Sequence, residues 1–138
     1  MSCFLGIDAG TSGIKAIVLE DTGKIQGTGY RECNLITTRP GWVEEDPQDW
    51  WTACCGAVAE AVSSSGRGKD IISIGFSGQM QGSTVLDANG EPVDRCIIWM
   101  DQRAAAQADM LNTRMSPVEM LEETANFCLP SYWAPKLL

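Results

Sequence analysis

The chain has 138 residues, of which 44% are hydrophobic, so it can fill one hydrophobic core but is too short for two large domains. Its formal net charge of −8 argues against a nucleic-acid partner, because nucleic-acid binding relies on clusters of Lys and Arg. The sequence has neither a leader pattern nor an apolar run long enough to span a membrane, which favours a cytoplasmic protein without membrane contact.

The chain contains no histidine. Nucleophile pairs of the Ser-His and Cys-His kinds are therefore excluded, unless another chain supplies the histidine. No CxxC pair occurs among the six cysteines, which also argues against a zinc site.

The N-terminal part of the sequence predicts three short strands, in the segments 3–8, 13–21 and 24–33. The first connection, AGTSG, is a hairpin loop, because the pattern after its glycines stays strand-like. A dinucleotide-binding fingerprint requires a helix at that point, so this type of site is excluded. We expect an antiparallel meander.

The clearest helix is predicted to start at the N-cap Asp46 with Pro47 in the first turn, and to end at Gly66. Further strands are expected in the segments 70–78, 82–91 and 95–101, and helices in 102–115, in 118–125 and near the end of 129–138. This order of strands and helices predicts an α/β or α+β fold.

The segment GIDAGTSGIK places Asp8 inside a glycine-rich turn. A carboxylate repels a phosphate unless a cation lies between them, and one aspartate at a strand end can hold Mg²⁺ against the phosphates of a nucleotide. Thr11, Ser12 and Gly13 would donate hydrogen bonds, and Lys15 would supply a positive charge. The alternative is an ordinary hairpin in which Asp8 only caps the turn.

Five segments resemble, in order and approximate spacing, the sugar kinases of the FGGY type: GIDAGTSGIKAIVLED, RPGWVEEDPQDWW, IGFSGQMQGSTVLDANG, IIWMDQRA and LPSYWAPKLL. The residues of these segments are most similar to the xylulokinase-like branch of this family. The resemblance implies an α/β, ribonuclease-H-like domain of the actin and hexokinase superfamily, with a mixed sheet that starts with the three-strand meander. It also implies that residues 1–138 form an incomplete N-terminal domain and that a second, C-terminal domain is absent.

The resemblance also implies roles for particular residues. Asp8 would be the catalytic and metal-binding residue, and ATP with Mg²⁺ would be held by the phosphate loop, residues Gly10, Thr11, Ser12, Gly13 and Lys15. The loop GQMQG would bind the sugar, with Gln79 orienting Met80 and Gln81. Trp99 would form an apolar wall of the sugar site, and a further contact would come from the segment near Ser131 and Tyr132.

Gln81 stands where the xylulokinase pattern has histidine, so the substrate is expected to be a ketose or polyol, with xylulose first and other sugars open. The general base and the adenine pocket of this family lie beyond residue 138, and we expect the chain alone to be inactive. It could be a fragment, a truncated reading frame or one piece of a split enzyme, with a missing C-terminal half or a homo-oligomer as partner. A non-catalytic module that binds a sugar or another partner is the alternative function.

Several of these residues also have purely structural interpretations. Trp99 could be buried in its strand, and Met80 could fill the core. Asp101 and Gln102 are expected to cap the next helix. The acidic residues Glu44, Glu45 and Asp46 are expected to form a solvated loop and the helix start.

Overall fold

The computed structural model describes residues 1–138, which divide into two compact units. The first unit comprises Met1–Leu35 and Asp46–Gln79, and the second comprises Ile36–Glu45 and Met80–Leu138.

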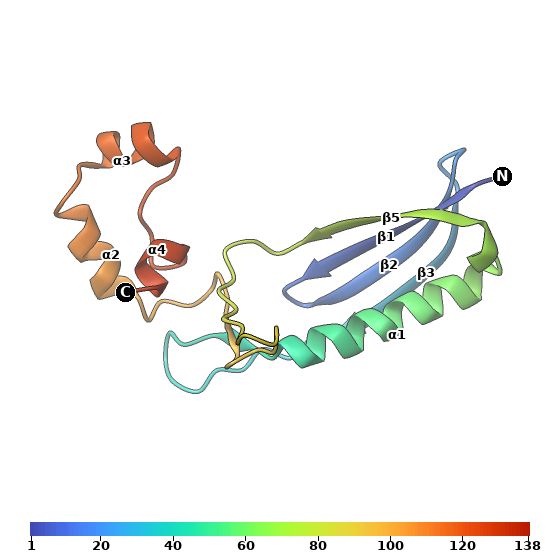
Figure 1. Cartoon of the computed structure of the whole chain (residues 1–138), viewed down its shortest axis with the longest axis horizontal. Coiled ribbons are helices and arrows are strands. Elements are labelled where there is room, and N and C mark those ends of the chain that lie inside the picture. Colours follow the sequence, from blue (N-terminus) through green and yellow to red (C-terminus); the bar gives the residue numbers. More distant parts are fainter. The chain divides into compact units, whose positions relative to one another are not determined.

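The first unit contains a four-stranded sheet in the order β3-β2-β1-β5 (Figure 1). Its strands are β1 (Cys3–Gly10), β2 (Gly13–Glu20), β3 (Ile25–Glu32) and β5 (Ile71–Gly78). The first three pair antiparallel, and β5 pairs with β1 in parallel. The sheet is therefore mixed, and the predicted meander is confirmed.

Helix α1 (Pro47–Ser65) covers one face of this sheet (Figure 1). It begins where predicted, because the Asp46 side chain accepts a hydrogen bond of 2.9 Å from the backbone N–H of Gln48. It ends at Gly66, whose φ of 62° is left-handed and suits glycine. The short 3₁₀ helix η1 (Gly68–Asp70) then leads into β5. The core lies between α1 and the strands and consists of Cys3, Leu5, Ile7, Ile14, Ala16, Val18, Ala53, Ala57 and Ala61.

Two glycines of β3 let α1 approach the strand backbone. A Cβ at Gly29 would lie 2.0 Å from the carbonyl oxygen of Ala57, and a Cβ at Gly27 would lie 2.2 Å from that of Ala61. No side chain fits at either distance. Helix and strand are therefore in backbone contact at these positions.

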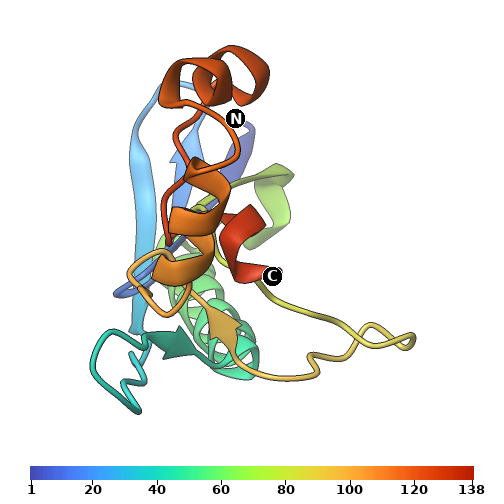
Figure 2. The same ribbon diagram turned by 90° about the vertical axis from the view of Figure 1, so that its left-hand side faces the viewer.

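The second unit contains little regular structure. Its strands β4 (Glu44–Glu45) and β6 (Cys96–Ile97) form a two-residue antiparallel pair. Figure 2 shows its helices α2 (Ala105–Asn112), α3 (Pro117–Thr124) and α4 (Trp133–Lys136) joined by turns. Helix α4 contacts α2. Ser116 and Glu119 form a reciprocal capping box that starts α3.

Two predicted strands of this unit are wrong in extent. Segment 82–91 is no strand; it makes only the isolated bridges Ser83↔Ile97 and Leu86↔Pro92. Its turn is dominated by Asp87, whose side chain accepts hydrogen bonds from the backbone N–H groups of Asn89 and Glu91. Segment 95–101 is a strand only over β6. Hydrogen bonds from a side chain to nearby backbone groups, such as those of Asp87, compete with the hydrogen bonds between strands.

Helix α2 starts at Ala105, three residues later than predicted, and the backbone N–H of Gln102 bonds to Gly41 O at 2.8 Å. No helix of the structure combines the length and the hydrophobicity that crossing a lipid bilayer requires.

The contact between α1 and β3 predicts that Gly29→Ala destabilises the first unit by about 2 kcal/mol, since the added methyl group overpacks a rigid interface. The matched control is Gly75→Ala in β5, where an added Cβ meets nothing within 4 Å and stability should stay within about 0.5 kcal/mol. Urea unfolding followed by far-ultraviolet circular dichroism measures both. Equal stabilities of the two variants would contradict the close approach.

Candidate functional site

Asp8 lies near the end of β1, on an open concave surface of the first unit. In the strand register its partners are Lys15 of β2 and Ser77 of β5. These three residues line a cavity of about 330 Å³ together with Gly6, Ile7, Ile17, Gly75 and Phe76. The side chains of Asp8 and Lys15 are both exposed. A carboxylate and an ammonium group thus stand side by side at the mouth of a shallow site.

The loop from β1 to β2, residues Gly10 to Gly13, is held from two sides. The Thr11 hydroxyl donates to Gln79 Oε1 at 3.1 Å, and the Gln79 backbone N–H donates to Ala9 O at 2.8 Å. On the other side, the Tyr30 hydroxyl donates to Ser12 O at 2.9 Å. These bonds fix the loop in one shape, as a phosphate-binding loop requires.

Gly13 is needed in this loop for steric reasons. A Cβ at this position would lie 2.3 Å from Arg31 O and 2.7 Å from the Tyr30 hydroxyl. The loop can therefore keep its close contact with β3 only with glycine here.

The surroundings of Asp8 fit a magnesium ion shared with a phosphate. The carboxylate makes no hydrogen bond or ion pair within the chain, although it stands in a cavity wall. No group of three or more His, Cys, Asp or Glu side chains is placed to hold a metal by itself. Mg²⁺ is often bound by only one or two carboxylates, several waters and substrate phosphates, so Asp8 alone suits this ion better than an all-protein metal site.

Of the residues predicted to bind or orient the sugar, Gln79 belongs to the first unit, whereas Met80, Gln81 and Trp99 belong to the second. Met80 is 75% exposed and does not fill the core. Trp99 is 46% exposed, so burial does not account for it either. Gln81 has a φ of 68°, a left-handed conformation that is uncommon for residues other than glycine.

Two side chains of α4 hold this loop by its backbone. Lys136 Nζ donates to Gln81 O at 2.8 Å, and Trp133 Nε1 donates to Gly82 O at 2.9 Å. Tyr132, just before α4, lines a second cavity of about 400 Å³ together with Gln81. The sequence analysis missed both Lys136 and Trp133, because nothing in the pattern indicates which distant carbonyl groups they reach.

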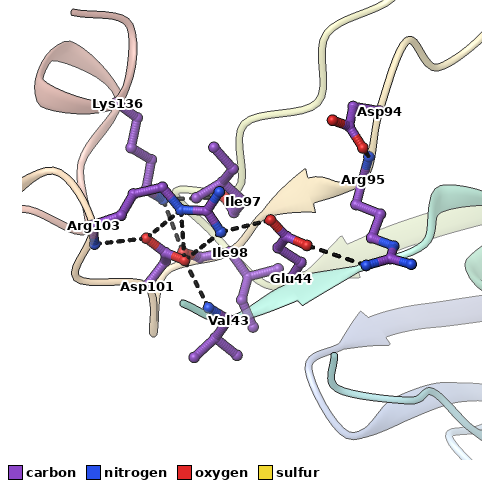
Figure 3. A network of polar contacts seen from close by, with 9 residues as sticks. All are labelled: Val43, Glu44, Asp94, Arg95, Ile97, Ile98, Asp101, Arg103 and Lys136. Atoms are coloured by element: carbon purple, nitrogen blue, oxygen red, sulfur yellow. Dashed lines mark hydrogen bonds and ion pairs between the residues drawn. The ribbon is translucent and has the colours of Figure 1, made fainter. Parts of the chain in front are cut away.

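An ion-pair network lies in the same unit (Figure 3). Asp101 has no exposed surface and accepts hydrogen bonds from the Val43 backbone N–H at 2.6 Å and from Arg103 Nε and Nη2. Arg103 also pairs with Glu44 at 2.7 Å, and Glu44 pairs more loosely with Arg95 at 3.5 Å. The network ties the segment after Trp99 to β4.

This network corrects two expectations. Asp101 and Gln102 do not cap α2, whose N-cap is Ala104 and has no side-chain cap. The acidic residues of 44–46 are not simply solvated, because Glu44 is half-buried in the network and Glu45 is 1% exposed. Only Asp46 keeps its predicted role, as the cap of α1. Asp101 differs from the prediction because its side chain bonds to Arg103 and to the distant Val43.

Burial alone would raise the pKa of Asp101, but the hydrogen bonds from Arg103 and Val43 and the charge of Arg103 lower it by more, so the pKa lies below its ordinary value. The charge of Asp101 therefore stabilises the fold fully above the unfolded-state pKa of about 3.9, and this stabilisation is lost as the pH falls through the folded-state pKa.

We accordingly expect Asp101→Asn to destabilise the second unit by about 3 kcal/mol at pH 7, because it leaves Arg103 without its buried partner. The deficit should begin to shrink below about pH 4, where Asp101 of the unfolded native-sequence chain becomes protonated, and it should shrink further as the pH falls through the lower folded-state pKa. The measurement is urea unfolding followed by tryptophan fluorescence between pH 3 and pH 7. Asp109→Asn, an exposed change on α2, is the control and should be neutral at every pH. A pH-independent deficit would argue against the charge of Asp101 as the cause.

The comparisons with known proteins agree on one kind of relative. The family profile "FGGY family of carbohydrate kinases, N-terminal domain" matches residues 3–138. The chain is 34% identical to a xylulose kinase of Escherichia coli over 98% of its length, and 34% identical to a glycerol kinase of Rhizobium meliloti over 96%. It spans about 27% of the length of each relative.

Among solved structures, a "xyloylose kinase" from Brucella ovis superposes with a TM-score of 0.88 at 35% identity, over 98% of this chain and 28% of that one. The predicted fold class, an α/β domain with a mixed sheet of the kind found in sugar kinases, is thereby confirmed.

Proposed function

The chain belongs to the FGGY family of carbohydrate kinases, and from this we propose that it forms the N-terminal part of an enzyme that transfers a phosphoryl group from ATP to a hydroxyl group of a ketose or polyol. The proposal concerns the intact enzyme, because the chain spans only about 27% of the length of the xylulose kinase that it matches.

The observation that carries the proposal is that Asp8 and Lys15 are neighbours in the strand register and line one cavity, beside the loop Gly10 to Gly13. Lys15 is placed to attract a phosphate, and the loop supplies backbone N–H groups beside it. Asp8 would hold Mg²⁺ through its free carboxylate, and the ion, when bound, neutralises charge on the phosphates during transfer. The Thr11–Gln79 hydrogen bond keeps the loop aligned with the end of β5.

The sugar is proposed to bind at Met80, Gln81 and Trp99. The Gln81 amide can both donate to and accept from a sugar hydroxyl, as a neutral histidine can. The exposed ring of Trp99 offers an apolar surface for the carbon face of a sugar. Xylulose is the first candidate because a xylulose kinase and a "xyloylose kinase" are among the relatives, and the glycerol kinase relatives make a shorter polyol the second candidate.

The proposed role of Asp8 predicts that Asp8→Asn in the intact enzyme lowers kcat at least about 100-fold, a loss of roughly 2.7 kcal/mol of transition-state stabilisation. The KM for the sugar should change less than about 3-fold, because Asp8 does not contact the sugar. Asp21→Asn, an exposed change in the turn after β2, is the matched control. Steady-state kinetics with varied sugar and Mg-ATP test this, and an unchanged kcat would remove Asp8 from the mechanism.

The proposed role of Gln81 predicts a change in substrate choice. Gln81→Ala should lower kcat/KM for every sugar by about 5- to 150-fold, because a lost buried hydrogen bond costs roughly 1 to 3 kcal/mol. Gln81→His should raise kcat/KM for xylulose relative to the other sugars. The KM for ATP should stay nearly constant in both variants.

The experiment measures kcat/KM across a panel of ketoses and polyols. Gln102→Ala, an exposed change in the same unit, serves as the control. An unaltered ranking of sugars together with unaltered absolute values would show that Gln81 does not face the substrate.

A further inference from the structure

The segments around Gln81 and Trp99 meet at one ammonium group. Lys136, the last residue of α4, donates from Nζ to Gln81 O at 2.8 Å, to Ile97 O at 3.1 Å and to Ile98 O at 2.9 Å. An ammonium group has three N–H donors, so the three carbonyl groups use all of them. Ile98 directly precedes Trp99. Figure 3 shows the Lys136 side chain extending from its helix to the backbone of Ile97 and Ile98.

The Gln81 conformation requires external support. A residue other than glycine in the left-handed region costs on the order of 1 to 3 kcal/mol and persists only where its surroundings hold it. Two successive carbonyl groups of this turn are held by α4: Gln81 O by Lys136, and Gly82 O by Trp133. The turn that presents the Gln81 side chain is therefore fixed from α4.

The chemistry of Lys136 distinguishes it from a packing residue. Its ammonium group forms no salt bridge, although the Asp101–Arg103–Glu44 network lies in the same unit. The Lys136 side chain is partly buried, and this desolvation of the ammonium group lowers its pKa. Desolvating a charge costs free energy that an apolar side chain of similar length would avoid. An apolar residue could not donate the three hydrogen bonds to these carbonyl groups.

We propose that Lys136 is a positioning residue of the sugar site, whose ammonium group fixes the segments of Gln81 and Trp99 relative to each other. This inference rests on the proposed function, because that proposal assigns Gln81 and Trp99 to the sugar. Lys136 itself does not need to touch the substrate.

In the intact enzyme, Lys136→Met keeps the length of the side chain and removes all three donors. We expect the KM for the sugar to rise at least about 10-fold, while the KM for ATP stays within about 2-fold. Lys136→Arg keeps the charge and several N–H donors, so its sugar KM should lie clearly closer to the native value. Lys24→Met, an exposed change in the turn between β2 and β3, is the matched control and should leave both constants unchanged.

A double-mutant cycle tests whether Lys136 acts through Gln81. In the Gln81→Ala background, the effect of Lys136→Met on kcat/KM for the sugar should be at least about 3-fold smaller than in the native background, because residues that share one interaction are not additive. Fully additive effects would overturn the action through Gln81.

A measurement without substrate tests separately whether Lys136 holds the two segments. In the 138-residue chain, Ser83 N–H bonds to Ile97 O at 2.9 Å, and Ile98 N–H bonds to Val43 O at 3.3 Å. Lys136→Met should speed amide hydrogen exchange in peptides that cover residues 79–84 and 96–99 at least about 10-fold. Exchange in β1 should not change, which shows that the first unit remains folded.

The outcomes separate the two proposals. An enzyme that phosphorylates sugars but loses sugar and ATP affinity equally in Lys136→Met overturns the positioning role and leaves the proposed function intact. Unchanged hydrogen exchange in both peptides of Lys136→Met directly overturns the proposal that Lys136 holds these segments. An intact enzyme that phosphorylates no ketose or polyol overturns the proposed function and the assignment to sugar, even where the exchange result shows that Lys136 holds the two segments.

Discussion

The packing of α1 against the meander is the constraint on which the first unit depends. Alternate residues of β1, Cys3, Leu5 and Ile7, are buried between the strand and the helix. Successive side chains of a strand point to opposite faces, so burying this set exposes Asp8 on the other face. A shift of one residue in register would bury the carboxylate and expose the core. The same hydrophobic contact that stabilises the sheet therefore presents the proposed metal-binding group.

The second unit is stabilised in a different way. Its two-residue strands and short helices provide few ladder hydrogen bonds, and side chains such as Asp101 and Lys136 bond to backbone groups instead. Polar networks of this kind specify one arrangement, because a buried polar group without its partner is costly. This arrangement would suit the proposed sugar site, since Lys136 bonds to the carbonyl groups of Gln81 and of Ile98, which directly precedes Trp99.

Much of this molecule was predictable from local sequence. Strand alternation, the hairpin loop and the cap at Asp46 gave the meander and α1, because these signals involve neighbours in the chain. The resemblance of five ordered segments predicted the family, and the family profile confirms it over residues 3–138. The roles of Asp8, of the phosphate loop and of Gln81 remain predictions, which the proposed experiments address.

Tertiary structure decided the features that depend on distant partners. The sequence itself determined that Asp8 stands between glycines at a strand end and that Gln81 follows the strand predicted for segment 70–78. It could not determine that Asp101 would be buried against Val43 and Arg103, or that Lys136 would reach three carbonyl groups up to 55 residues away in sequence. Hydrophobic periodicity and helix caps depend on residues that are close in sequence. The partner of a buried charge depends on the tertiary structure, because only packing brings the two groups within hydrogen-bonding distance.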